Sequence, residues 1–175
     1  DLPPARERHL LIVAIRPILL YPHPGLKSKT AAVVLSDPAV QIVVQDLLDT
    51  LAASPGVALA APQIGHPVQV IVVDVSRKKG ETGHGLTVLL NPIILAVEGR
   101  KILREGCLSV SDYTGNVLRH EQAIVEGLAP DGRVITMSTS GFEALAFQHE
   151  VDHLQGTLFL DRIQSLSTDL FRRKP

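Results

Sequence analysis

The stretch FQHEVDHLQG, residues 147–156, decides how this chain is interpreted, because it carries two histidines four residues apart. Residues with that spacing lie one above the other on a helix, so His149 and His153 can aim two imidazoles at one point. Glu150 follows the first histidine directly. This is the H-E-x-x-H arrangement, in which the histidines bind a metal and the glutamate works as general base. The alternative is a surface helix that carries two histidines by chance.

The residues around this stretch predict the helix that holds it. Ser140 and Glu143 form a capping-box pattern at its start, and Gly156 is a typical residue at its end. Three apolar residues share the face of the two histidines: Phe142, Leu145 and Ala146. That face is expected to be buried. An ordinary core histidine would explain one of the pair, whereas two in register beside a glutamate favour a metal site.

Two histidines leave a metal short of ligands, so the chain must supply a third. The extended protease pattern asks for a histidine at position 159, where the chain has Phe159, and no glutamate follows the helix. Asp161 and Asp169 remain as alternatives. Cys107, in EGCLS at 105–109, is the better candidate, because one Cys and two His form a catalytic three-ligand site with an open fourth position. The alternative for this cysteine is a small buried hydrophobic residue.

A further segment, SPGVALAAPQIG at residues 54–65, is rich in small residues. Small side chains let another backbone approach closely. Gln63 offers an amide donor to a ligand oxygen. The alternative is a plain turn with a solvated glutamine.

Composition bounds the class of protein. The 175 residues, 45% of them hydrophobic, predict one domain over 1–175. The core is expected to consist of Val, Leu, Ile and Ala, since aromatic residues make up only 3%. The formal net charge of -1 gives no electrostatic case for nucleic acid or an anionic membrane.

The compartment is predicted from the cysteine and the N-terminal region. The single cysteine excludes an intramolecular disulfide and fits a reducing environment. The apolar run Leu10–Ile15 is too short to span a bilayer and lies between arginines, unlike a signal peptide. The cytoplasm is therefore expected, with an organelle as the alternative if a transit peptide has been removed.

Periodicity and turn residues predict the remaining elements. Residues 1–37 are expected to be irregular, and a helix is expected to start at Asp37-Pro38 and to stop at Ser54-Pro55-Gly56. The closing stretch Arg172–Lys174 is expected to be a solvated tail. Four segments have strand patterns, the last two forming a hairpin around 129–132: residues 68–75, 87–97, 122–128 and 133–139.

Taken together, three motifs in this order resemble the signature motifs of peptide deformylases: GVALAAPQIG, EGCLS and QHEVDH. The resemblance runs from about residue 19 to residue 162 and includes YPHPGL at 21–26 and VLRH at 117–120. It implies an α+β fold in a single domain, with antiparallel strands packed around a central helix that carries the H-E-x-x-H motif.

The resemblance also implies the reaction and its residues. The chain is expected to remove the N-formyl group from the N-terminal methionine of newly made polypeptides and to release formate. Glu150 is the implied general base. The Gln63 side chain and the backbone N–H of Leu108 are the implied donors to the developing oxyanion. Three residues are the implied ligands of one divalent metal: Cys107, His149 and His153.

Cofactor and substrate contacts follow in the same way. The resemblance implies Fe²⁺, while a Cys/His set suits Zn²⁺ equally well on ligand softness. The main chain near Ala58 and Leu108 is implied to pair with the extended peptide. Ala58 stands where the family usually has a glycine, so residue 58 is expected to have β-region backbone. Four residues are candidates for the lining of the methionine pocket: Leu103, Phe142, Leu145 and Ala146.

The implied partners are N-formyl-Met nascent peptides, which the protein is expected to encounter at the ribosome. The expected state is a monomer with neither nucleic-acid nor membrane binding. Two alternatives stay open. One is another H-E-x-x-H metallohydrolase, such as a peptidase, whose third ligand is not Cys107. The other is a peptide-binding module of the same fold that does no chemistry. Loss of Glu150 or Cys107 would have favoured that module, and both are present.

Overall fold

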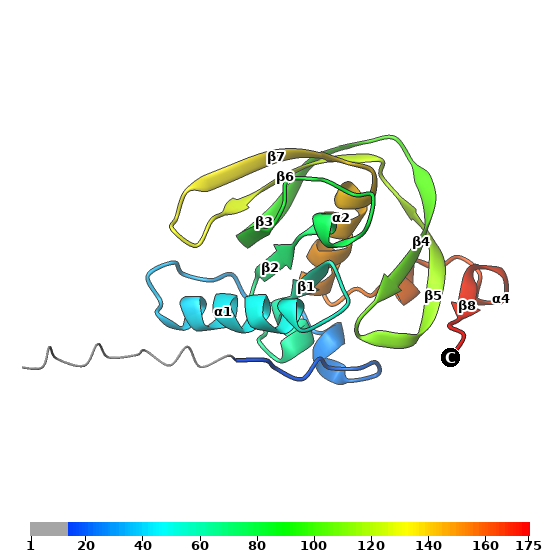
Figure 1. Cartoon of the computed structure of the whole chain (residues 1–175), viewed down its shortest axis with the longest axis horizontal. Helices are drawn as coiled ribbons and strands as arrows, with labels where there is room; N and C mark the ends of the chain where they lie inside the picture. The colour runs from blue at the N-terminus through cyan, green and yellow to red at the C-terminus, as the bar shows by residue number, and fades with distance from the viewer. Residues whose placement is uncertain (1–13) are drawn as a thin grey trace, which may run out of the picture.

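The structure, a computed structural model, describes residues 14–175 and consists of two antiparallel sheets around one central helix (Figure 1). The helix is α2 (Gly141–Leu154), and it lies beneath the arch of the larger sheet. The larger sheet has the order β1-β2-β3-β6-β7: Ala58–Ala60, Val70–Val73, Thr87–Glu98, Gln122–Leu128 and Val134–Ser140. The smaller sheet has the order β4-β5-β8: Lys101–Cys107, Val110–Arg119 and Leu170–Arg172. The expected α+β fold is confirmed.

Six shorter or peripheral helical segments complete the described chain. The α-helices are α1 (Ala39–Ala52), α3 (Phe159–Arg162) and α4 (Leu166–Asp169). The 3₁₀ segments are η1 (Pro24–Lys27), η2 (Ala61–Ile64) and η3 (Val75–Arg77). Within residues 14–175, no helix combines the length and the apolar character that crossing a bilayer would need.

Strand β2 divides the core into two layers. Val70 and Val72 pack in the cluster formed with α1, whereas Ile71 and Val73 pack in the cluster formed with α2. Alternate side chains of a strand point to opposite faces of its sheet, so the two helices cover opposite faces. This explains why all four residues of β2 are buried. A strand buried on both faces reads as a continuous apolar run.

The predicted capping box at the start of α2 is wrong. The Ser140 side chain makes no capping hydrogen bond. The carboxylate of Glu143 instead accepts from the backbone N–H of His84 at 2.7 Å and lies 2.6 Å from its Nδ1. Glu143 therefore fixes the loop after η3 to the first turn of α2, a long-range contact that local spacing does not reveal.

Gly156, predicted at the end of α2, is confirmed there. The helix closes at Gln155, and Gly156 follows with a φ of 72°. A Cβ at this position would come within 2.5 Å of the backbone carbonyl oxygen of Lys27. Glycine is required both for the left-handed conformation and for the close passage of the segment after η1.

The strand predictions for 87–97 and for the hairpin are confirmed by β3, β6 and β7. The ladder between β3 and β6 shifts register around Pro92, where Asn91 has a φ of 49°. The run 68–75 yields a shorter strand, because η3 takes over at Val75. The first helix begins at Ala39, whose backbone N–H donates to the Asp37 carboxylate at 2.9 Å.

Two further expectations concern the chain ends. Residues 14–37 are irregular, as predicted, except for η1 and an isolated bridge between Ala31 and Val68, while 1–13, including most of the apolar run, lie outside the described residues. The closing stretch 172–174 is exposed, as predicted, but Arg172 is not part of a tail, because it pairs with Tyr113 as the last residue of β8. Backbone pairing with β5, rather than any apolar pattern, holds this segment.

Candidate active site

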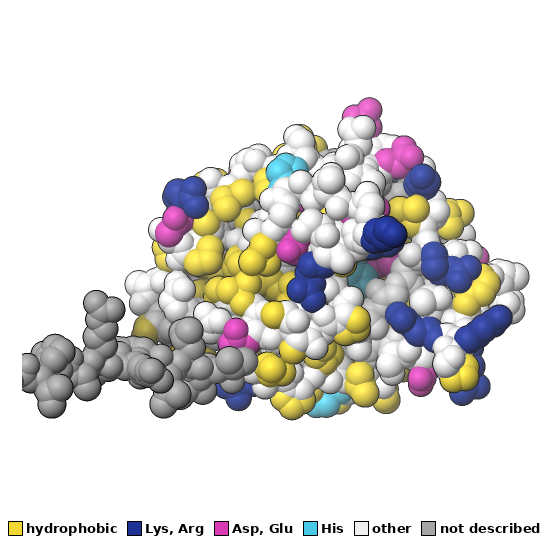
Figure 2. Space-filling model, in the orientation of Figure 1, with side chains coloured by type: hydrophobic (Ala, Val, Ile, Leu, Met, Phe, Trp, Pro, Cys, Tyr) yellow, Lys and Arg dark blue, Asp and Glu magenta, His cyan; other side chains and the backbone are white. Residues whose placement is uncertain are grey.

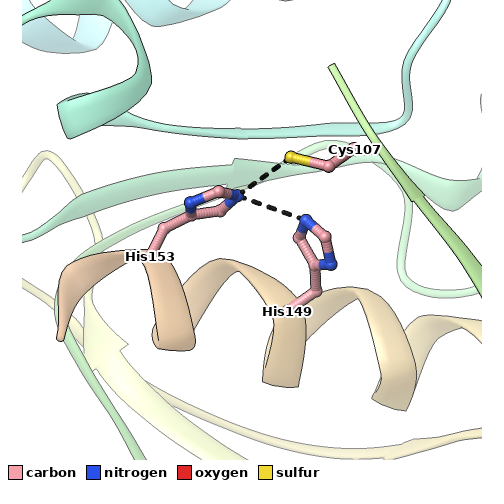
Figure 3. A group of neighbouring side chains, drawn as sticks. All are labelled: Cys107, His149 and His153. Carbon is pink, nitrogen blue, oxygen red and sulfur yellow. Dashed lines mark hydrogen bonds between the residues drawn. The ribbon is translucent and has the colours of Figure 1, made fainter. Parts of the chain in front are cut away.

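Helix α2 and the end of β4 bring three ligand-type side chains together (Figure 3). Nε2 of His153 lies 3.4 Å from Sγ of Cys107 and 3.2 Å from Nε2 of His149. The three ligand atoms lie within 4.8 Å of one another, and all three residues are buried. Figure 3 shows the two imidazoles rising from adjacent turns of the helix toward the sulfur. The structure thus unites the residues that the motifs singled out.

This donor set fits a divalent metal. A thiolate and two imidazole nitrogens that converge from different elements match the three-ligand catalytic arrangement. Burial and the neighbouring His149 lower the pKa of His153 well below its usual range, so its imidazole is neutral at pH 7. A neutral imidazole offers the lone pair that a metal ligand must donate.

Glu105 orients the first histidine. Its Oε1 lies 2.5 Å from Nδ1 of His149. This contact at Nδ1 turns Nε2 of His149 toward Cys107 and His153, which is the usual outer partnership of a metal-binding histidine. Because Glu105 and Cys107 are two residues apart on β4, they point to the same side of the strand.

A buried ion-pair network supports Glu105 in turn. Arg119 donates two hydrogen bonds to its carboxylate, at 2.7 and 2.8 Å, and a third to Asp152 at 2.6 Å. The carboxylate of Asp152 also accepts a hydrogen bond from Arg162, which lies half exposed at the surface. Burial alone would raise the pKa of Glu105, but the hydrogen bonds from Arg119 and His149 outweigh it and lower the pKa to about 2. Glu105 is therefore a permanent carboxylate beneath His149.

Glu150 differs sharply from Glu105. Its Oε2 is buried without a hydrogen-bond partner, and within residues 14–175 the one other such side-chain atom is Nδ1 of His153. An unpaired buried oxygen is costly, so such atoms concentrate where a ligand or a reaction uses them. Burial raises the pKa of Glu150 to about 7. A carboxyl group in this range can both accept and return a proton near neutrality.

Gln63 is held with its amide nitrogen facing the cysteine. Its Oε1 accepts from the backbone N–H of Ala60 at 2.9 Å, which settles the orientation of the amide. Its Nε2 lies 3.6 Å from Sγ of Cys107 and 3.1 Å from Oγ of Ser109. The side chain is buried, so the alternative of a solvated turn glutamine is wrong.

Leu108 lies in the two-residue turn that joins β4 to β5. A Cβ at Gly56 would come within 2.8 Å of Cδ1 of Leu108, so the first motif and EGCLS pack directly against each other. This close approach is what the small residues of the first motif permit. It brings the backbone of Leu108 to the same cavity as Gln63 and Cys107.

Ala58 lies on a free sheet edge. Strand β1 is the outermost strand of its sheet. The backbone N–H of Asp74 donates to the carbonyl of Val57, and the next pair in register is Ala58 with Val73. Hydrogen-bonded and non-bonded pairs alternate along an antiparallel ladder, so the N–H and C=O of Ala58 point away from β2. Ala58 is part of a regular strand and is absent from the positive-φ residues, as predicted.

The cavity over these residues has a volume of about 440 Å³. Ala58, Gln63, Leu108 and Glu150 line it, together with three of the four predicted pocket residues: Phe142, Leu145 and Ala146. Leu103, the fourth, lines a neighbouring cavity of about 500 Å³ that shares Phe142 and Leu145. His153 lies beneath the floor rather than on the lining.

Sequence reasoning gave no role to Glu105, Arg119 or Ser109. One signal for Glu105 was present, because its spacing of two from Cys107 places both on one side of a strand. Arg119 lies in the VLRH segment, but nothing local indicates that it would be buried. No local feature of the sequence indicates a role for Ser109, whose contact with Gln63 joins residues 46 positions apart.

Comparisons with known proteins agree with this geometry. The family model described as "Polypeptide deformylase" matches residues 15–169. A similar relative is the peptide deformylase of Syntrophobacter fumaroxidans, which is 43% identical over 162 residues, covering 93% of this chain and 94% of the relative.

Solved structures show the same likeness. The crystal structure of a peptide deformylase from Legionella pneumophila has a TM-score of 0.80 and 37% identity, covering 87% of this chain and 88% of the other. A class I type b peptide deformylase from Acinetobacter baumannii, with Met-Ala-Ser bound, has a TM-score of 0.80 and 31% identity. That likeness covers 87% of this chain and 100% of the other.

Proposed function

This chain belongs to the peptide deformylase family, and on that premise we propose which of its residues perform each part of the reaction. The family consists of metal-dependent hydrolases that remove the N-formyl group from nascent peptides. The metal ligands proposed in this chain are Cys107, His149 and His153. When bound there, a divalent metal supplies Lewis acidity toward water and the formyl oxygen.

Glu150 is the proposed proton carrier. It takes a proton from the attacking water as the new C–O bond forms at the formyl carbon, and it delivers that proton to the amine nitrogen as the C–N bond breaks. The products are formate and a peptide with a free amino group. The observation that carries this assignment is the buried, unpartnered Oε2 of Glu150 beside the convergent ligand set.

The formyl oxygen gains negative charge during the attack. We assign its stabilisation to Nε2 of Gln63 and the backbone N–H of Leu108, which border the same cavity as Cys107. The Gln63 amide is fixed by Ala60 before substrate arrives, so little reorganisation accompanies the reaction. Preorganised donors of this kind are each worth about 10²–10³-fold in rate.

The substrate is proposed to bind as an added strand. Strand β1 of the larger sheet and β4 of the smaller sheet are both edge strands, and both border the cavity. An extended peptide can hydrogen-bond to a free strand edge through its main chain. Ala58 offers its outward N–H and C=O for this purpose. The methionine side chain then occupies the apolar part of the cavity: Phe142, Leu145 and Ala146, with Leu103 at its far side.

The assignment is tested by formate release from formyl-Met-Ala-Ser, with metal content measured on the same samples. Cys107→Ser and His153→Gln are expected to lose the metal and the activity together. His120→Gln is the matched control, since His120 lies outside the ligand set and contacts the Gly99 carbonyl. Full metal occupancy with unchanged turnover in Cys107→Ser would overturn the ligand set.

We propose Fe²⁺ as the native metal and Zn²⁺ as the alternative. The Cys/His donor set accepts either ion. Metal analysis of protein purified without oxygen distinguishes them, and reconstitution of the metal-free protein with each ion then shows which supports turnover. Iron as the main ion in the anaerobic preparation is the expected result, and zinc would contradict it.

We also propose a cellular setting for the reaction. Because the substrate is a nascent peptide, action at the ribosome is expected, and co-sedimentation with translating ribosomes tests it. The monomeric state, the single domain over 1–175 and the cytoplasmic compartment stay predictions. Light scattering, limited proteolysis and cell fractionation are their respective tests.

A further inference from the structure

Three cationic side chains surround the mouth of the active-site cavity, and we call them the basic rim: Lys78, Arg104 and Arg173. Lys78 follows η3, Arg104 lies in β4, and Arg173 follows β8. All three line the same cavity as Glu150 and Cys107. Figure 2 shows Lys and Arg side chains gathered around a hollow on this face of the molecule.

Each rim side chain is held in place by an uncharged group. Nζ of Lys78 lies 4.1 Å from the centroid of the Phe142 ring. The guanidinium carbon of Arg104 lies 3.5 Å from the centroid of Phe171. Nη2 of Arg173 lies close over Gly106, where an added Cβ would come within 2.5 Å of it. Contacts with rings and backbone position these cations without neutralising them.

The charge of the rim is not compensated by neighbouring carboxylates. Among residues 14–175, no ion pair includes Lys78, Arg104 or Arg173. The two acidic residues that line this cavity are Glu105 and Glu150, and both are buried. Glu105 is already paired with Arg119 and His149.

Acidic residues do occur nearby, in the neighbouring cavity that shares Lys78 and Arg104 with the active-site cavity. Glu81 and Glu121 line the neighbouring cavity, where Lys78 and Arg104 of the rim and a further cation, Lys101, outnumber them. Neither glutamate lines the cavity that holds the reacting groups. The active-site cavity therefore has three rim cations and no exposed carboxylate, and two of those cations, Lys78 and Arg104, also face the neighbouring cavity.

We propose that the basic rim makes this enzyme favour formyl-Met peptides with acidic side chains just after the methionine. The inference rests on the proposed function and names the substrate class of the same site. An extended peptide rises about 3.3 Å per residue and points successive side chains to opposite sides. The second to fourth residues of the peptide therefore lie near Lys78, Arg104 and Arg173 at the mouth of the cavity. Carboxylates on these peptide residues can pair with the three cations.

The size of the preference follows from exposed ion pairs. Each exposed ion pair contributes little binding free energy, so two carboxylates on the peptide should raise kcat/KM by roughly 3- to 10-fold. The gain should appear mainly in KM, because the rim holds the ground state and the transition state equally. It should also shrink as salt rises, since exposed charges are screened.

The test compares formyl-Met-Ala-Asp-Glu-amide with its uncharged isostere, formyl-Met-Ala-Asn-Gln-amide. The ratio of their kcat/KM values is measured in each protein, which cancels any general change in activity. The wild-type ratio should exceed 3 at low salt and approach 1 in high salt, by the scale of exposed ion pairs. Arg173→Met should lower it by about 2-fold, and the triple Lys78→Met, Arg104→Met, Arg173→Met variant should bring it close to 1.

Lys29→Met is the matched control, because it removes one positive charge outside both cavities. Its ratio should equal that of the wild type, whereas an equal fall in Lys29→Met and Arg173→Met would overturn the rim. A wild-type ratio of 1 at low salt would also overturn it. If the rim variants then bound ribosomal RNA less tightly than Lys29→Met does, the rim would be reassigned to nucleic acid. Formate from neither peptide in metal-loaded wild type would instead refute the proposed function.

Discussion

Helices α1 and α2 have the same length of 14 residues, yet they differ in how much of their surface is buried. Helix α1 presents one apolar stripe to the sheet, including Val43, Val44 and Leu47, while Ile42 stays exposed on its other side. Helix α2 has eight consecutive buried residues, from Glu143 to Glu150. One helix covers the core, whereas the other lies inside it (Figure 1).

The difference teaches how a polar site can occupy the centre of a small protein. Helix α1 is held mainly by hydrophobic burial of a periodic apolar stripe, although it also buries Asp46 and Thr50. Helix α2 buries Phe147 and Leu154 in the same way, but it also buries five polar side chains: Glu143, Gln148, His149, Glu150 and His153. Most of these have dedicated partners from distant segments. Glu150 is the exception, and it is the residue proposed to move the proton.

The largest expected effect is on that exception. Glu150→Gln keeps the shape of the side chain but cannot carry a proton, so kcat should fall by about 10²–10⁴-fold. Metal content should stay at the wild-type level, measured by atomic absorption alongside formate release. Glu143→Gln is the control on the same helix, and its kcat should stay within a few-fold. Loss of metal in Glu150→Gln would mean that Glu150 is a ligand.

The buried network should be nearly as sensitive, but through stability. Arg119→Met leaves Glu105 buried without its two hydrogen bonds from the guanidinium, which should lower the free energy of unfolding by about 3–5 kcal/mol. Chemical denaturation of the metal-free protein measures it. Arg162→Met removes the half-exposed partner of Asp152 and should cost only about 0–1 kcal/mol. Equal losses in both variants would refute the distinction between buried and exposed pairs.

Helix α1 should respond in stability alone. Leu47 is fully buried, so Leu47→Ala should lower the free energy of unfolding by about 2–5 kcal/mol. Below the melting range kcat/KM should not change, because no residue of α1 lines the cavity. Ile42→Ala on the exposed side should stay within about 0.5 kcal/mol of wild type. A fall in kcat/KM for folded Leu47→Ala would show that α1 also positions the site.

The smallest expected effect concerns Ala58. Since β1 is a regular strand at this position, glycine is not needed for a special backbone angle. Ala58→Gly should therefore change kcat/KM for a formyl-Met peptide by less than about tenfold, or 1.4 kcal/mol. A much larger gain in formate release, with an unchanged melting temperature, would show that the methyl group obstructs the peptide.

Local sequence predicted those parts of the fold whose cause is local. The hairpin of β6 and β7 follows from two alternating strands around a Pro-Asp-Gly turn. The edges of α1 were predicted to within two residues because Pro38 and Pro55-Gly56 punctuate them. The capping box failed because Glu143 has a long-range partner, His84, that competes for its carboxylate.

Strands β4 and β5 escaped prediction for a related reason. Buried positions on these strands carry Glu105 and Arg119, which contradict an apolar alternation. Each is tolerated because it forms an ion pair with the other from the neighbouring strand and because His149 and Asp152 complete the network. Strand β8 has three residues, too few for any periodic signal, and exists by pairing with β5.

The amino-acid sequence by itself determined the proposed ligand set, because a spacing of four places His149 and His153 on one helical face, and because the chain has one cysteine. Tertiary structure alone decided what surrounds that set. Glu105 became the partner of His149, Gln63 was turned toward Cys107, and the basic rim was assembled from segments as distant as residues 78 and 173. Local spacing follows from backbone geometry, whereas these contacts depend on how two separate sheets close around α2.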